Sequence, residues 1–105
     1  MGLTFLWAEK QVDDQVKQHP DGYRDDDKIF AKDKEELSEM KTALAAYKAS
    51  PTEENLKALK TEIGDRLFPI LCFVNKNNIS LEECFNLMME KNRNKAENDY
   101  KKEEK

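Results

Sequence analysis

Residues that interrupt helices are rare in this chain, and their scarcity constrains its fold more than any other feature of the sequence. The 105 residues include three glycines and three prolines. Lys, Glu, Leu, Ala and Met, which all favour helix, are abundant, and β-branched residues are few. The sequence therefore predicts an all-α fold.

The few interruptions divide the chain into four predicted helices. A His-Pro-Asp-Gly turn is expected at 19–22, a Ser-Pro break begins at Ser50, and a polar loop covers 75–78. The acidic run at 25–27 and the Ser-Leu-Glu-Glu sequence from Ser80 supply helix N-caps. The helices are expected at about 3–18, 27–49, 52–75 and from 80 onward.

Apolar residues recur at steps of three and four within these segments, as on helices that bury one face. We predict a four-helix bundle-like protomer in which the two long helices are central. Residues 95–105 have little apolar surface to bury. We therefore predict one all-α domain over 1–94, followed by a polar, charged tail that is a frayed helix or disordered.

Two residues interrupt the third predicted helix. Pro69 removes a backbone donor and is expected to kink the helix near 65–66. Gly64 costs about 1 kcal/mol relative to alanine inside a helix. It either permits a close helix approach or leaves room for a ligand.

The bulky and reactive side chains are assigned mostly to the core. The aromatic side chains expected there, rather than against a nucleobase, are Phe5, Trp7, Phe30 and Phe85. Cys72 and Cys84 have apolar neighbours and are expected to be buried. Tyr23 and Arg24 lie in a predicted loop, a position from which they could close over a substrate.

The chain is short enough that its own core is thin. A folded chain of this length buries about 60–68% of its unfolded surface, so association with another copy is expected.

The 18 Lys+Arg and 22 Asp+Glu residues give a net charge of −4, which argues against a protein that coats a nucleic-acid polymer. No apolar run approaches the roughly 18 residues of a membrane span. Residues 1–7 are apolar but lack the basic start of a secretory signal.

The sequence does not contain the residues that several common kinds of functional site require. His19 is the only histidine and the two cysteines form no CxxC pair, so a zinc site is not expected. Catalysis by Ser-His-Asp or Cys-His would depend on His19, which nothing in the sequence places beside a nucleophile. The sequence has no glycine-rich phosphate loop. With only two cysteines, reduced thiols in a cytoplasmic setting are predicted.

Two pairs of carboxylates differ from the other acidic residues. Glu36 and Glu39 lie about 60° apart on one face of the second predicted helix, where like charges repel unless a cation lies between them. Glu36 is also within roughly 40° of Met40 and Tyr47. Its carboxylate is therefore expected to point along the apolar stripe of the helix.

Glu62 and Asp65 repeat this spacing in the third predicted helix, next to the apolar run 67–74. If the two helices pack antiparallel, all four carboxylates can face each other. Such hard oxygen ligands suit Mg²⁺ or Mn²⁺ that bridges to phosphate oxygens. This arrangement indicates a metal-dependent enzyme acting on a phosphorylated substrate. The alternative is a chance pattern of solvated acids in a chain that is 38% charged.

The acidic residues also form a longer pattern. Residues 35–39 read Glu-Glu-Leu-Ser-Glu and, 22 residues further on, 62–65 read Glu-Ile-Gly-Asp. This pattern resembles the EExxE…ExxD signature of the MazG-like nucleoside triphosphate pyrophosphohydrolases. The run at 62–68 and the final helix, with its Lys/Asn/Arg cluster at 91–95, are similar to the same family. The resemblance covers about 35–95.

The resemblance implies an all-α protein that forms a homodimer or, as a dimer of dimers, a homotetramer. It implies Mg²⁺-dependent hydrolysis of a (deoxy)nucleoside triphosphate to the monophosphate and pyrophosphate, as in cleaning of the nucleotide pool, with Mn²⁺ as a substitute. The implied metal ligands are Glu36, Glu39, Glu62 and Asp65. Glu35 is implied as a catalytic residue that orients or deprotonates water. The implied substrate-binding residues are Lys91, Asn92, Arg93 and Lys95.

Two other interpretations stay open. A phosphoribosyl-ATP pyrophosphohydrolase shares a similar acidic pattern, and the Lys-Asn-Arg sequence at 91–93 favours the MazG-like family over it. The second is a non-catalytic helical dimerisation or interaction module, against which the intact acidic quartet argues. Pro69 departs from the family pattern just after the ExxD motif, where it could reshape the base pocket.

Overall fold

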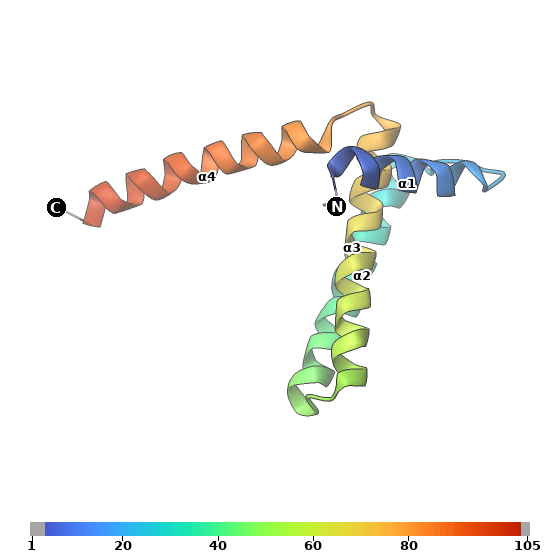
Figure 1. The fold of residues 1–105 in the computed structure, drawn as a ribbon, viewed down its shortest axis with the longest axis horizontal. Coiled ribbons are helices and arrows are strands. Elements are labelled where there is room, and N and C mark those ends of the chain that lie inside the picture. Colours follow the sequence, from blue (N-terminus) through green and yellow to red (C-terminus); the bar gives the residue numbers. More distant parts are fainter. Residues whose placement is uncertain (1–3, 104–105) are drawn as a thin grey trace.

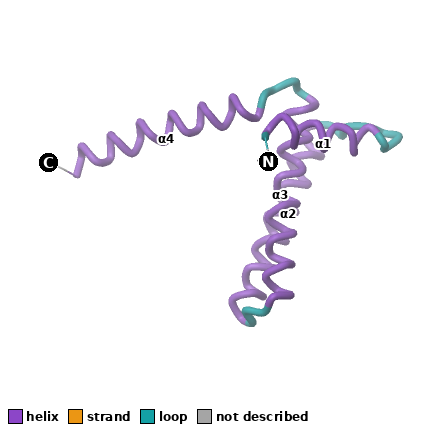
Figure 2. Tube along the Cα trace, viewed as in Figure 1, coloured by secondary structure: helices purple, strands orange, loops and turns teal. Residues whose placement is uncertain are grey.

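Four helices make up the fold. The structure, a computed structural model, describes residues 4–103, and the side chains of 4–97. The helices are α1 (Phe5–Lys17), α2 (Asp26–Ala49), α3 (Glu53–Lys76) and α4 (Leu81–Glu103), with no strand in the described range (Figures 1 and 2). The predicted all-α class is confirmed. Leu3, the predicted start of the first helix, lies outside the described residues.

Besides the Thr4 cap of α1, side-chain caps fix where the other three helices begin. The Asp25 carboxylate accepts a hydrogen bond from the backbone N–H of Lys28 at 2.9 Å, at the start of α2. The Thr52 hydroxyl accepts the equivalent bond at 3.1 Å at the start of α3. The Ser80 hydroxyl accepts one at 3.2 Å at the start of α4. Each cap satisfies a donor that the helix itself cannot, so the starts of α2, α3 and α4 fall within one residue of their predicted positions.

The helices α2 and α3 form an antiparallel hairpin, and α1 packs across the end where α2 begins and α3 ends (Figure 1). We call this end the core end. Its buried cluster comes from all three helices and consists of Val12, Val16, Ile29, Leu71 and Cys72. Apolar side chains of α1, α2 and α3 thus meet at the core end and form a small core there.

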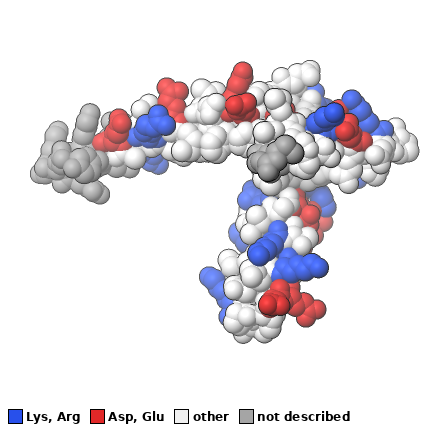
Figure 3. Space-filling model, in the orientation of Figure 1, with Lys and Arg blue, Asp and Glu red and all other residues white. Residues whose placement is uncertain are grey.

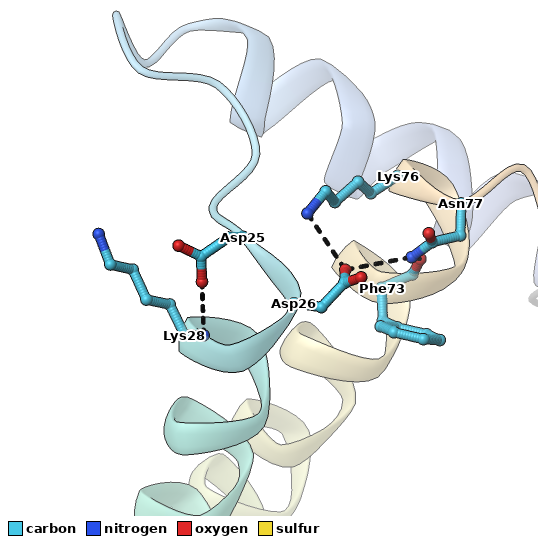
Figure 4. Close-up of polar contacts among 6 residues, drawn as sticks. All are labelled: Asp25, Asp26, Lys28, Phe73, Lys76 and Asn77. Atoms are coloured by element: carbon cyan, nitrogen blue, oxygen red, sulfur yellow. Dashed lines mark hydrogen bonds and ion pairs between the residues drawn. The ribbon is translucent and has the colours of Figure 1, made fainter.

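Polar contacts join α2 and α3 at the core end. The Asp26 carboxylate accepts hydrogen bonds from Lys76 Nζ at 3.1 Å and from Asn77 Nδ2 at 3.4 Å (Figure 4). Asn77 Nδ2 also donates to the Phe73 carbonyl at 2.9 Å. These contacts, Lys76 first, hold the pKa of Asp26 below its usual value. The start of α2 is therefore fastened to the end of α3.

The fourth helix projects away from the hairpin (Figure 1). Only its start is anchored. There, Leu81 packs against the core, the Leu81 N–H donates to Glu9 Oε1 at 2.9 Å, and the Phe85 ring lies 5.3 Å from that of Phe5. The radius of gyration is 17.5 Å, whereas a compact chain of this length has about 13 Å. The bundle-like packing predicted for the protomer is thus confined, within one chain, to α1–α3.

The lengths of the helices also differ from the prediction. The two central helices, predicted to be the long ones, have 24 residues each, and α4, with 23 residues, is nearly as long. The helix continues through most of 95–105 because Lys, Glu and Ala favour helix and no glycine or proline stops it. The fraying or disorder of this segment in solution stays a prediction, as does the domain boundary at residue 94.

Both interruptions of α3 are accommodated. The helix runs through Pro69, which is buried, and its assignment is unbroken at 65–66. A Cβ at Gly64 would meet no atom within 4 Å. Gly64 therefore serves no close helix approach within the chain, and the space beside it is open.

Several large apolar side chains lie on the surface of the single chain. The prediction of a core position is wrong for Trp7, Phe30 and Phe85, which are 54%, 55% and 41% exposed. It is also wrong for Cys84, whereas Cys72 is buried as predicted.

Charges of both signs are scattered over the face in Figure 3, with uncharged surface between them on α4. No helix in the described range is both long and apolar enough to cross a membrane.

Candidate metal centre

Three carboxylates converge near the middle of the α2–α3 hairpin. Glu36 comes from α2, and Glu62 and Asp65 come from α3. One oxygen of each lies within 4.8 Å of one oxygen of each of the others. The antiparallel pairing brings the two helices together here, and the three-residue spacing keeps both α3 carboxylates on one face. We call these three residues the acidic cluster.

Two oxygens of the acidic cluster are buried without a hydrogen-bond partner. Glu36 is only 4% exposed, as its inward direction on the helix predicts. Its Oε1 accepts from Lys32 Nζ at 2.9 Å, but its Oε2 has no partner, and Glu62 Oε2 has none either. Buried charged oxygens without donors are costly. A hard cation between them would satisfy both, so the donor set fits Mg²⁺ or Mn²⁺.

Glu39 lies at the rim of the acidic cluster. It is exposed and does not converge with the other three. The negative charge of Glu36 comes first in raising the pKa of Glu39, followed by partial loss of water around its carboxylate, a side-chain contact with Glu36 and the charge of Glu62. Its carboxylate therefore lies in the field of the same group of charges, one helical turn from Glu36.

Glu35 lies on the outer side of this region. Its carboxylate is exposed, and Lys32 Nζ is 3.8 Å from its Oε1. The hydrogen bond to Glu36, followed by the charges of Glu36, Glu35 and Glu39, raises the pKa of Lys32. Lys32 is therefore held as a cation among the carboxylates of α2.

A pocket of about 720 Å³ lies between the loop before α2, the first turns of α2 and α3. Its lining includes Tyr23, Arg24, Lys28, Lys32, Phe68 and Pro69. Burial, and a hydrogen bond of 2.6 Å from its hydroxyl to Asp13, raise the pKa of Tyr23 to about 12, so the phenol stays neutral. The pocket combines apolar walls with three cationic side chains and the two carboxylates of Asp21 and Asp25. Lys32 joins the pocket to the acidic cluster.

The sequence pointed to only part of this pocket. Tyr23 and Arg24 were placed by their loop position, and both line it. The sequence analysis does not identify Lys28 and Lys32, although Lys28, Lys32 and Glu36 follow one another at steps of four residues and so share one helix face. That spacing was the available signal.

The predicted substrate-binding residues lie elsewhere. Their positions on α4 are Lys91, Asn92, Arg93 and Lys95, all exposed. Asn92 Nδ2 donates to Met88 Sδ on its own helix at 3.1 Å. Because α4 leads away from the hairpin (Figure 1), a single chain does not bring these side chains to the acidic cluster.

The chain matches one family model and one relative by sequence, and two solved structures by fold. The model of the MazG nucleotide pyrophosphohydrolase domain matches residues 27–99, a range that includes the acidic cluster and the basic residues of α4. YpjD of Bacillus subtilis (strain 168), an uncharacterized protein, is 32% identical over 91 residues, which are 84% of this chain and 82% of YpjD.

The structural matches cover most of both chains. The crystal structure of the Bacillus-conserved MazG protein, a nucleotide pyrophosphohydrolase, has a TM-score of 0.75 and 28% identity over 87% of this chain and 90% of that one. The crystal structure of Bacillus subtilis YpjD has a TM-score of 0.74 and 29% identity over 89% of this chain and 98% of that one. The arrangement of helices described above is therefore shared with these proteins.

Proposed function

Because this chain belongs to the MazG nucleotide pyrophosphohydrolase domain family, we propose that it hydrolyses a (deoxy)nucleoside triphosphate to the monophosphate and pyrophosphate with the help of Mg²⁺. Mn²⁺ is the expected substitute. The observation that carries this proposal is the pair of buried, partnerless oxygens of Glu36 and Glu62, next to a pocket with basic residues.

The metal would be held by the carboxylates of α2 and α3. The acidic cluster of Glu36, Glu62 and Asp65 supplies converging oxygens, and Glu39 adds a fourth carboxylate from the rim. When bound, a divalent cation supplies charge neutralisation for phosphate oxygens and a lower pKa for water. Glu35, exposed at the edge, is assigned to orient or deprotonate the attacking water.

The pocket is assigned to the nucleotide. Tyr23 and Phe68 offer flat apolar surfaces for a base or sugar. Arg24 and Lys28 place positive charge where a triphosphate would enter. Pro69 is part of the lining, so the residue that departs from the family pattern contributes to the shape of this pocket and hence to substrate choice.

A second copy of the chain completes the site in this proposal. The substrate-binding role of Lys91, Asn92, Arg93 and Lys95 requires that α4 of one protomer reaches the acidic cluster of another. Exposed apolar side chains on α3 and α4, among them Leu67 and Leu87, at 53% and 66% exposure, support such an assembly. We propose a homodimer or a homotetramer acting in a cytoplasmic nucleotide pool.

The direct test is release of pyrophosphate from a panel of nucleotides. The panel contains the eight common ribo- and deoxyribonucleoside triphosphates, several modified bases and phosphoribosyl-ATP. Each reaction is run with Mg²⁺, with EDTA, and with Mg²⁺ restored. We expect metal-dependent turnover of at least one (deoxy)nucleoside triphosphate. Exclusive turnover of phosphoribosyl-ATP would replace the proposed substrate, and no turnover of any compound would leave the non-catalytic module as the better account.

A further inference from the structure

Lys32 lines the pocket and also forms an ion pair with a member of the acidic cluster. It lies one turn before Glu36 on α2, with its Nζ 2.9 Å from Glu36 Oε1 and 3.8 Å from Glu35 Oε1. Its side chain is 44% exposed, and it belongs to the pocket lining. The ammonium therefore lies at the boundary between the proposed metal ligands and the space proposed for the nucleotide.

A divalent cation at Glu36 would change the surroundings of this ammonium. Without metal, Lys32 is the nearest positive charge to a buried carboxylate that has one unpaired oxygen. A bound divalent cation would neutralise Glu36 and repel the ammonium at short range. Since lysine has a long stem with freely rotating bonds, the ammonium can leave Glu36 without any change in the backbone.

Apart from its two ion pairs, Lys32 faces the pocket that it lines. Arg24 and Lys28 line the same space, together with the carboxylates of Asp21 and Asp25, of which Asp25 already accepts from the Lys28 N–H. With Lys32 released into the pocket, three cationic side chains face two carboxylates, which leaves a net positive charge for an anion to balance. A polyphosphate provides that anion and accepts charge-assisted hydrogen bonds from lysine.

We propose that Lys32 exchanges partners: it is the counter-ion of Glu36 in the metal-free protein and a polyphosphate-binding residue in the metal-loaded protein. This inference rests on the proposed function, because it takes the acidic cluster as the metal site and the pocket as the nucleotide site. It assigns to Lys32 two effects of opposite sign. Lys32 opposes binding of the first cation and promotes binding of the polyphosphate.

The experiment compares Lys32→Met with wild type in two binding assays that need no turnover. The first titrates the protein with MnCl₂ alone and measures free Mn²⁺ by electron paramagnetic resonance. We expect Lys32→Met to bind Mn²⁺ about fivefold more tightly, the effect of removing one nearby unit charge. The second titrates the protein with inorganic tripolyphosphate at saturating Mn²⁺ by calorimetry. There we expect binding about tenfold weaker, because one charge-assisted hydrogen bond is lost.

Two further variants separate this role from a general effect of charge. Lys34→Met removes an exposed charge about 200° around the same helix, and it should change both affinities by less than about twofold because exposed charges are screened. Lys32→Arg keeps the charge and should restore tripolyphosphate binding to within about threefold of wild type.

The two affinities decide the outcome together. A tighter Mn²⁺ complex with a weaker tripolyphosphate complex supports partner exchange. Unchanged affinities, or a loss of both, would overturn it and leave Lys32 as a surface ion pair or a structural residue. If opposite shifts occurred in a protein that hydrolyses no nucleotide, the proposed function would fail while the role of Lys32 stood.

Discussion

The core end of the α2–α3 hairpin and its middle are made from the same two helices but treat buried groups in opposite ways. At the core end, apolar side chains such as Ile29 and Leu71 are buried, and Asp26 is paired with Lys76 and Asn77. In the middle, by contrast, a carboxylate oxygen of Glu36 and one of Glu62 are buried without partners.

This difference assigns stabilisation of the fold to the core end and, in our proposal, ligand binding to the middle of the hairpin. Packing and satisfied hydrogen bonds at the core end stabilise the hairpin. The acidic cluster opposes this stabilisation, because three like charges gather there and one of them, Glu36, is buried while Glu62 is half-buried. Under the proposed function, a bound cation would remove this cost. The two regions should therefore respond differently to the same kind of change.

The largest effect is expected from Glu62→Gln. This substitution keeps the size of the side chain but removes one charged metal ligand, so activity should fall by about a thousandfold, or roughly 4 kcal/mol of transition-state stabilisation. Without metal, the variant should be at least as stable as wild type because repulsion with Glu36 is relieved. Pyrophosphate release and denaturant unfolding in EDTA measure the two quantities.

The matched control for this change is Glu54→Gln. Glu54 is exposed in the first turn of the same helix, so its loss should leave activity within about twofold of wild type. Full activity in Glu62→Gln would remove this residue from the metal site.

The next effect is expected from Leu71→Ala at the core end. Leu71 is 7% exposed in a small core, and its truncation should lower the free energy of unfolding by about 3 kcal/mol. The activity of the molecules that stay folded should be retained, since no carboxylate is touched. Urea unfolding and an assay at low temperature check both points, and a parallel loss of activity per folded molecule would show that the two regions are not separable.

A smaller contrast is expected between the two thiols. Burial raises the pKa of Cys72 to about 11, whereas Cys84 is exposed on α4. At pH 8, Cys84 should react with a disulfide reagent about a hundredfold faster than Cys72, because only the thiolate is nucleophilic. Labelling kinetics with Cys84→Ser as control measure this.

The raised pKa of Cys72 also predicts how the stability of the fold depends on pH. The neutral thiol is the form that the folded core accepts, so the contribution of Cys72 is complete below the unfolded pKa near 9 and is lost as the pH rises toward 11. If Cys72 reacted as fast as Cys84, the core end would be open to solvent and the comparison of the two regions would weaken.

Much of the fold follows from local signals in the sequence. The caps at Asp25, Thr52 and Ser80 place three helix starts because each satisfies donors within a few residues. The burial of Glu36 follows from its angle on the helix. Such features depend on neighbours within about one turn, and the sequence contains that information directly.

Features that depend on distant parts of the chain were harder to predict. The sequence predicts core positions for Trp7 and Phe85, yet both are exposed, and α4, which carries Phe85, leads away from the hairpin (Figure 1). Helical periodicity shows which face of α4 is apolar, but not whether that face packs on its own chain or elsewhere. For the same reason, the roles proposed for Lys91 and Asn92 depend on how two copies meet.

The most direct test of the central account measures the unfolding temperature with increasing Mn²⁺. Wild type should be stabilised by about 2.7 kcal/mol when Mn²⁺ reaches about 100 times its dissociation constant. Leu71→Ala should gain the same increment from a lower start, and Glu62→Gln should gain little. If Glu62→Gln were stabilised by Mn²⁺ as much as wild type, the partnerless oxygens in the middle of the hairpin would not be the metal site.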